Sequence, residues 1–188
     1  PDGQAAMFDG AAFIEVPHDA SLNPPEFTVA FFARVDGGSG AYRSPLMSRS
    51  GGGGLPVHGY NFYASATDQW EIYLGTGAEW IAATDPADLV LGRTSFVAGT
   101  YDGEVAVLYV DGIPTASATT PLAPNTDAGL YIGVGWTGLP EYFFNGAVDE
   151  VAIFDRALFA SEIASLHEVA LCDGGEAESE AEGESEAE

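Results

Sequence analysis

The sequence predicts an all-β protein, a two-sheet antiparallel sandwich with one short helix near its C-terminus. Apolar and polar residues alternate in about a dozen short runs, which is the pattern of half-buried strands. Turn signals, among them several Asp-Gly pairs, separate these runs. The composition includes 24 Gly, 11 Pro, 3 Trp, 8 Tyr and 11 Phe, and it favours turns and strands over helices.

The expected strands are runs rich in β-branched and aromatic residues that lie between turn signals. The strongest signal surrounds the run VAVLYV, where Asp102-Gly103 precedes the run and Asp111-Gly112 follows it. Two successive hairpins are therefore predicted there. In chain order, the expected strands cover residues 6–8, 12–16, 27–35, 45–48, 60–64, 70–74, 80–84, 94–101, 104–110, 113–118, 130–134 and 146–154.

A single helix is expected over residues 161–170. Ser161 is a residue type that caps helix N-termini, and Ile163 and Leu166 begin an apolar series at helical spacing. The helix follows the last expected strand, so we expect it to pack on an edge of the sandwich.

The chain divides into two regions by composition. At 188 residues with 46% hydrophobic residues it suffices for one full-sized β domain, which we assign to residues 1–172. Residues 173–188 read DGGEAESEAEGESEAE and contain no large apolar side chain. Such a segment cannot offset the entropy lost on ordering, so we expect a disordered acidic tail that links this domain to further ones.

The charge excludes several classes of partner. The formal net charge is −24, from 29 acidic and 5 basic residues. Nucleic acids and anionic membrane surfaces repel such a protein, and no apolar run approaches the ~20 residues of a membrane span. The acidic body leaves room for Ca²⁺, which binds carboxylate and carbonyl oxygens, although ordinary solubility explains the same charge. Cys172 is the only cysteine, which excludes an internal disulfide, and its role stays open.

Four motifs follow one another in the order typical of a known family. They read AMFDGAAFIEVPHDASLNP, FTVAFFARV, SFVAGTYDGEVAVLYVDGIPTASAT and FNGAVDEVAIFDRALFASEI. Over residues 6–164 the chain thereby resembles the laminin-G-like, concanavalin A-like lectin-glucanase domains. The resemblance implies a jelly-roll sandwich that binds a ligand, in the setting of a secreted or cell-surface protein.

The same resemblance implies a Ca²⁺ where the first and last strands meet. Asp9 and Gly10 would supply oxygens from the N-terminal turn, and Asp149 would supply one from the closing strand. Such an ion would stabilise the fold rather than take part in chemistry. In the alternative interpretation, Asp9 is only a turn residue and Asp149 only a half-exposed strand residue.

Catalysis is not expected. A retaining glycosidase needs two carboxylates about 5 Å apart, and the sandwich glucanases supply them from an E-x-D-x-x-E pattern that is absent here. Asp149 and Glu150 are adjacent, so they point to opposite faces of a strand. The chain also lacks the G-x-S-x-G, H-E-x-x-H and P-loop motifs.

Aromatic side chains are the candidate ligand contacts, because a ring can stack on the apolar C–H face of a sugar. Trp136 stands in the Gly-rich segment GVGWTGLPEYF, expected to be a rim loop. Tyr63 and Tyr73 alternate out of phase with Phe62 and Trp70, which favours exposure on the face away from the core. Core packing is the alternative for each ring. The expected ligand-binding residues are Trp136, Tyr142, Trp80, Tyr63 and Tyr73.

Together these features predict a non-catalytic binding module that recognises a polysaccharide or glycoconjugate. One alternative is a structural or self-assembling surface protein without a glycan ligand, and another is a degenerate glycosidase. The sandwich fold alone does not decide among them, because it carries many functions.

Overall fold

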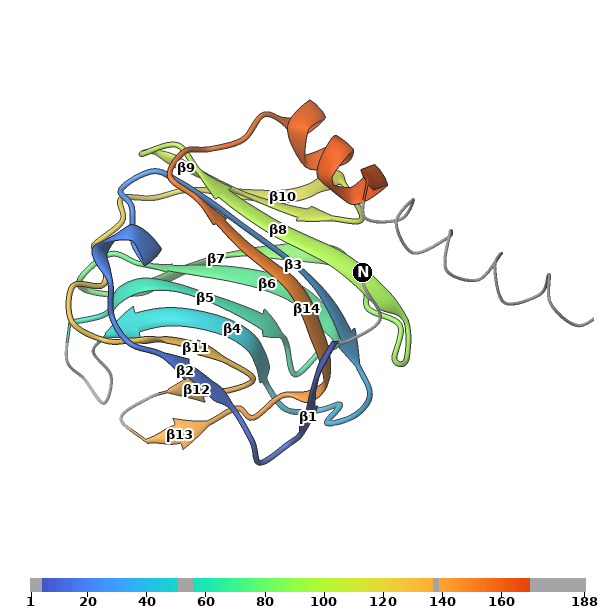
Figure 1. Ribbon diagram of the computed structural model, residues 1–188. Helices are drawn as coiled ribbons and strands as arrows, with labels where there is room; N and C mark the ends of the chain where they lie inside the picture. The colour runs from blue at the N-terminus through green and yellow to red at the C-terminus, as the bar shows by residue number, and fades with distance from the viewer. Residues whose placement is uncertain (1–4, 51–55, 137–138, 170–188) are drawn as a thin grey trace, which may run out of the picture.

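The protein is a sandwich of two antiparallel sheets, as predicted (Figure 1). The structure, a computed structural model, describes residues 5–50, 56–136 and 139–169. Each sheet has six strands, and the α-helix in the described part of the chain covers residues 160–169. No helix within the described ranges is long and apolar enough to cross a membrane.

The strand order interleaves distant parts of the chain. The first sheet runs β1 (Ala6–Asp9), β14 (Asn145–Phe154), β3 (Phe27–Val35), β8 (Thr94–Tyr101), β9 (Val105–Val110) and β10 (Ile113–Thr119). The second sheet runs β2 (Ile14–Val16), β11 (Leu130–Ile132), β4 (Arg43–Ser50), β5 (His58–Ala64), β6 (Gln69–Gly75) and β7 (Trp80–Asp88). A small hairpin joins β12 (Gly135–Trp136) and β13 (Pro140–Glu141), and a 3-10 turn covers Ala20–Leu22.

The predicted hairpins around β9 are confirmed. Asp111 and Gly112 both have positive φ, 51° and 78°, which is the backbone of the tight turn that Asp-Gly favours. Asp102 holds the other turn, because its carboxylate accepts hydrogen bonds from the amides of Glu104 and Val105. All the expected strands are present. The β12–β13 hairpin is an addition, since the segment around it was expected to be a loop.

The core lies between the two sheets. Phe31 of β3 meets Phe62 of β5 edge-to-face, with 5.1 Å between the ring centroids. Trp70, Ile72 and Leu74 point inward from β6 and are at most 2% exposed, as their shared phase predicts. This core fixes which residues of the second sheet point outward, because side chains alternate along a strand.

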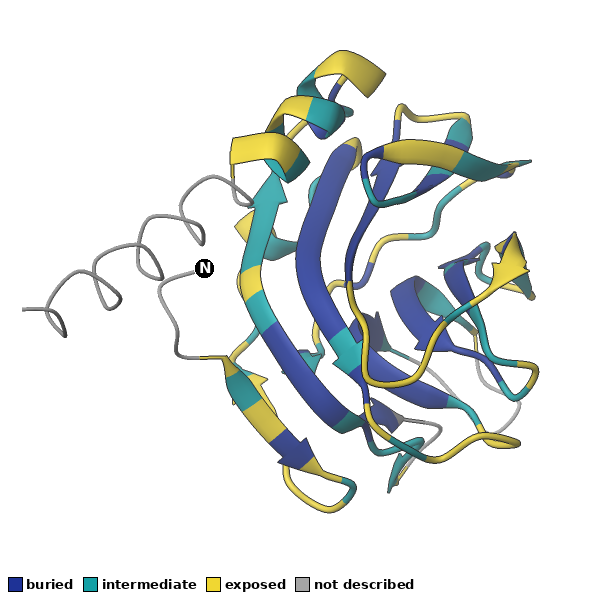
Figure 2. Cartoon of the chain, turned by 90° about the vertical axis from the view of Figure 1, so that its right-hand side faces the viewer, coloured by how far each residue is buried: buried dark blue, intermediate teal, exposed yellow. Residues whose placement is uncertain are grey.

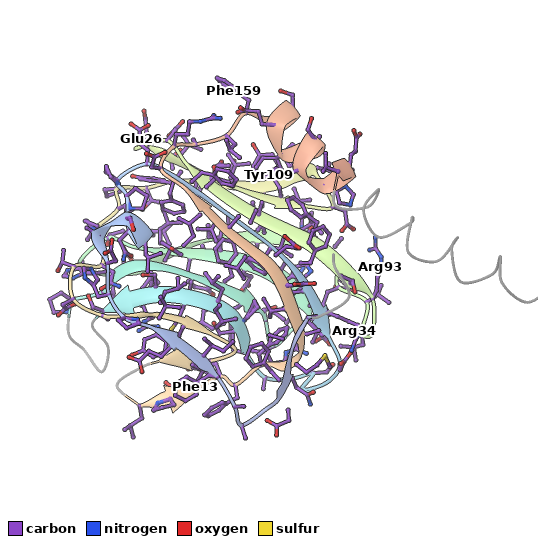
Figure 3. All side chains as sticks on the ribbon, viewed as in Figure 1. Phe13, Glu26, Arg34, Arg93, Tyr109 and Phe159 are labelled. Atoms are coloured by element: carbon purple, nitrogen blue, oxygen red, sulfur yellow. The ribbon has the colours of Figure 1, made fainter. Side chains whose placement is uncertain are left out.

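A second apolar layer covers the outer face of the first sheet. Leu158 and Ile163, before and within the helix, pack against Phe32, Phe96 and Tyr109 (Figure 3). The opposite side of the helix is exposed (Figure 2). In the described part of the chain, the α-helix therefore shields the first sheet and not the second.

The helix starts one residue earlier than predicted, and Ser161 is not its cap. Phe159 occupies the capping position, because its carbonyl accepts the first helical hydrogen bond, from Ile163. The Glu162 carboxylate accepts a hydrogen bond from the Phe159 amide at 2.8 Å and pairs with Arg156. These contacts, Arg156 foremost, lower the pKa of Glu162 to about 2. A capping-box glutamate therefore performs the role expected of the serine.

Gly99 tests how tightly the two sheets pack. A Cβ at this β8 position would overlap the Ile72 Cδ1 atom and the Phe62 ring of the opposite sheet. We expect Gly99→Ala to lower the free energy of unfolding by about 1–3 kcal/mol, measured by urea denaturation. Ile72→Val removes the Cδ1 atom, so the double variant should lose less than the sum of the two single losses. Strict additivity would contradict the close packing.

Candidate functional site

The outward face of the second sheet carries polar and aromatic side chains that are nevertheless buried. Register places Asn61 beside Tyr73, and Tyr63 beside Glu71, on strands β5 and β6. Asn61 is 1% exposed, Tyr63 5% and Glu71 7%. Buried polar groups on the outside of a sheet are unusual, and they mark this face as the candidate site.

Four tyrosines, which we call the tyrosine cluster, meet on this face: Tyr42, Tyr63, Tyr73 and Tyr142. Tyr63 is central, and its ring centroid lies 5.2 Å from Tyr42, 5.5 Å from Tyr73 and 5.8 Å from Tyr142. All three pairs are edge-to-face, which is a favourable arrangement for aromatic rings. The Tyr42 and Tyr73 hydroxyl oxygens are 3.4 Å apart.

Tyr142 enters the cluster from a constrained backbone. Its φ is +53°, a left-handed conformation that is uncommon for a bulky residue. The Ser44 amide donates a hydrogen bond of 2.8 Å to the Tyr142 carbonyl and ties it to the start of β4. Gly135 leaves the space that the Tyr142 side chain occupies, because a Cβ there would lie 2.9 Å from it. The β12–β13 hairpin thus holds the Tyr142 ring in the cluster although its backbone conformation is unfavourable.

Arg49 and Trp80 form a stacked pair on the same face. The Arg49 guanidinium carbon lies 4.5 Å from the centroid of the Trp80 ring, a cation–π distance. The two residues come from β4 and β7, which are separated by β5 and β6. Arg49 is opposite Gly59 and Trp80 is opposite Gly75 in their strand pairs. At both glycines a Cβ would collide with backbone atoms, so only glycine fits opposite each member of the pair.

Three oxygen atoms at this site lack a hydrogen-bond donor within the described residues. They are Asn61 Oδ1, Glu71 Oε2 and Glu141 Oε1, all buried. The other Glu71 oxygen accepts a hydrogen bond of 3.2 Å from the Thr84 hydroxyl. An unsatisfied buried acceptor costs about 1–3 kcal/mol, so these atoms are placed for donors that the folded chain does not supply.

The surroundings on this face keep Tyr63 and Tyr73 neutral, because they raise the pKa of both hydroxyls. Burial raises the pKa of Tyr63 to about 12; nearby Arg49 opposes the rise, while Tyr142 and Glu141 add to it. Burial, followed by the contact with Tyr42 and the charge of Glu71, raises the pKa of Tyr73 as well. Burial also raises the pKa of Glu71, while the nearby hydroxyls of Thr84 and Tyr73 oppose the rise. The Tyr63 and Tyr73 hydroxyls therefore stay able both to donate and to accept hydrogen bonds.

The structure brings most of the expected ligand-binding residues together. Tyr63, Tyr73 and Tyr142 share the tyrosine cluster, and Trp80 lies on the same sheet. The expectation that Tyr63 is exposed is wrong, because three neighbouring rings enclose it and leave it 5% exposed. Trp136 lies in strand β12 rather than in a loop, and its side chain is outside the described part of the structure.

Sequence reasoning missed five residues at this site: Tyr42, Arg49, Asn61, Glu71 and Glu141. A signal existed for Asn61 and Glu71, which alternate in phase with Tyr63 and Tyr73. No local pattern identifies Tyr42 or Glu141, because they reach the site from segments outside the long strands.

The residues expected to bind calcium do not form one site. Asp9 pairs with Asn145, four positions along β14 from Asp149, a separation of about 13 Å. The Asp9 carboxylate caps its own turn by accepting hydrogen bonds from the Ala11 and Ala12 amides. The Gly10 amide donates to the Phe144 carbonyl. The antiparallel register thus separates the carboxylates, and no cluster of three His, Cys, Asp or Glu suited to a metal occurs within the described ranges.

Comparison with known families decides the classification. The family model of the concanavalin A-like lectin/glucanases superfamily matches residues 8–164. The chain belongs to this superfamily. The four sequence motifs therefore identified its relatives correctly, and the superfamily's two-sheet architecture is the one observed. A search of curated protein sequences found no match.

Solved structures with the same fold include proteins crystallised with sugars. A Ruminococcus gnavus IT-sialidase CBM40 bound to α2,3-sialyllactose has a TM-score of 0.73 at 14% identity, covering 87% of this chain and 96% of that one. Domain 4 of an extracellular arabinanase from Geobacillus stearothermophilus, in complex with arabinotriose, has a TM-score of 0.72 at 20% identity, covering 89% and 79%. A putative carbohydrate-binding protein from Bacteroides ovatus has a TM-score of 0.64 at 22% identity, covering 85% and 45%.

Glu71 provides a pH-dependent test of the site. The folded-state pKa of Glu71 lies above the ordinary 4.5. Its ionisation therefore has no effect on stability below about pH 4.5, and it lowers the free energy of unfolding as the pH rises from there through the raised pKa. Glu71→Gln carries no charge at any pH. We expect the variant to match the wild type at about pH 4 and to exceed its melting temperature at about pH 7.5.

The matched control is Glu26→Gln, an exposed residue at the opposite end of the molecule (Figure 3). It should change the melting temperature little at either pH. A Glu71→Gln variant that is less stable than the wild type at neutral pH would show that the carboxylate is satisfied and structural.

Proposed function

We propose that the chain is a non-catalytic carbohydrate-binding module whose ligand lies on the outward face of the second sheet. The observation that carries this proposal is the coincidence of half-buried rings with buried oxygen atoms that lack donors. Rings stack on the C–H faces of sugars, and the oxygens accept hydrogen bonds from sugar hydroxyls. Pre-formed sites of this kind combine apolar walls with a few fixed polar groups.

The related structures support the same class of ligand. Two of them are complexes with oligosaccharides, sialyllactose in one and arabinotriose in the other. Their low identity to this chain means that the shared fold, and not shared contact residues, is the basis for the comparison. We further propose that the module works in a secreted or cell-surface protein, joined to other domains, where it holds a polysaccharide or glycoconjugate.

Binding without turnover is proposed because the carboxylates are arranged unlike those of the sandwich glucanases. Those enzymes place the reacting pair on alternate positions of one strand, whereas Glu71 lies on β6 and Glu141 on β13. One carboxylate oxygen of Glu71 also accepts a hydrogen bond from the Thr84 hydroxyl. Release of reducing sugar at enzyme-like rates from any bound polysaccharide would contradict this part of the proposal.

The binding face is tested by removing single rings. Trp80→Ala and Tyr142→Ala should each weaken polysaccharide binding about tenfold, or about 1.4 kcal/mol, in affinity electrophoresis against a panel of soluble polysaccharides. Trp136→Ala belongs in the same series, because its role stays a prediction. Phe159→Ala is the control, since this ring is 73% exposed on the opposite side of the sandwich. Equal loss from the control, or no retardation by any polysaccharide, would contradict the proposal.

Calcium stabilisation is a separate part of the proposal. At a hundredfold excess over its dissociation constant, a bound ion adds about 2.7 kcal/mol, so Ca²⁺ should raise the melting temperature of chelator-treated protein by several degrees. Since the register separates Asp9 from Asp149, only one of the variants Asp9→Ala and Asp149→Ala should abolish the response. A melting temperature independent of Ca²⁺ would exclude the stabilising role.

A further inference from the structure

The distribution of positive charge limits what the candidate site can bind. All five basic residues of the chain are arginines, and the structure describes each of them. Four are paired with carboxylates at 2.6–2.8 Å: Arg34 with Asp36, Arg43 with Asp68, Arg93 with Asp111 and Arg156 with Glu162. Arg34 lies near the end of β3 and Arg93 directly before β8, both internal strands of the first sheet (Figure 3). Arg43 is the one of these four on a strand of the second sheet, and its guanidinium is buried against Asp68 and the Gly37 and Ser65 carbonyls, so none of the four is placed to receive a ligand carboxylate there.

Arg49 is the arginine that lies on the candidate face, and its charge already interacts with aromatic side chains of the protein. Its guanidinium stacks on Trp80, and it acts on Tyr63, whose pKa it lowers against the effect of burial. The side chain is 5% exposed. Recognition of a carboxylate favours a guanidinium that presents two parallel N–H groups to the ligand, and a buried, stacked arginine is poorly placed for that.

Three buried oxygen atoms of the face are suited to hydrogen-bond donors. Asn61 Oδ1, Glu71 Oε2 and Glu141 Oε1 are acceptors without donors among the described residues. A sugar hydroxyl can donate to each of them. The carboxylate of an acidic sugar only accepts, so it would bring its lone pairs and its charge against Glu71 and Glu141, with little water to screen them. The net charge of −24 adds a repulsive field at longer range.

We infer that this site selects uncharged sugars and rejects sugars that carry a carboxylate. The inference rests on the proposed function and adds the class of ligand to it. Rings supply stacking area for either class, but the acceptor oxygens and the two glutamates discriminate between them. A relative that binds an acidic sugar on the same fold, such as the module complexed with sialyllactose, therefore does not define the ligand here.

The test compares carboxylated sugars with neutral ones. Polygalacturonate and its methyl ester differ only at the carboxyl group, whereas α2,3-sialyllactose carries a whole acidic sugar that lactose lacks. A panel of neutral polysaccharides is screened beside polygalacturonate and its fully methyl-esterified form, and lactose beside α2,3-sialyllactose, at physiological salt. We expect binding to the neutral members, and at least tenfold weaker binding to a carboxylated sugar than to its neutral counterpart. Stronger binding to the carboxylated member would overturn the inference and leave the proposed function intact. Binding to no member of either class would overturn the proposed function itself.

Site variants locate the source of the discrimination. Replacing Glu71 and Glu141 together by glutamine should reduce the neutral-to-acidic affinity ratio about tenfold, because both amides can donate to a carboxylate. The matched control replaces Glu26 and Glu168, which are exposed and lie at the opposite side of the molecule, and it makes the same change in net charge. If both double variants change the ratio equally, or neither changes it, the two site glutamates are not the discriminating groups and the inference is wrong.

Discussion

Side chains alternate in direction along each strand, and every second side chain must pack into the core between the two sheets. Phe31, Phe62 and Ile72 fill that space so closely that β8 has room only for Gly99 opposite them. This packing sets the register of β5 and β6 and therefore the set of residues that must point outward. Tyr63, Glu71 and their neighbours occupy the candidate site because the other half of their strands forms the core.

The same alternation explains how much the sequence could predict. It placed Trp70 in the core, and it put Tyr63 and Tyr73 on the opposite face, both correctly. It could not predict that Tyr63 is enclosed, because Tyr42 and Tyr142 come from segments whose path depends on the tertiary fold. The two aspartates that were expected to bind calcium show the same limit. Asp9 and Asp149 belong to paired strands, but only the register reveals that they lie four positions apart.

The candidate site works against the stability of the fold. Buried oxygens without donors, a glutamate whose charge is poorly solvated and a tyrosine in a left-handed conformation are each unfavourable. The aromatic and apolar packing around them holds these groups in place. Such an arrangement limits the reorganisation needed on binding, since the groups that meet a ligand are already desolvated and oriented.

The position of the helix on the first sheet also decides which face of the sandwich stays open to a ligand. The helix and the segment between it and β14 lie on the side of the sandwich formed by the first sheet, and the tyrosine cluster lies on the other side. In the described part of the chain, the residues that follow β14 therefore leave the proposed binding face uncovered, so a long polymer can lie across it without displacing them.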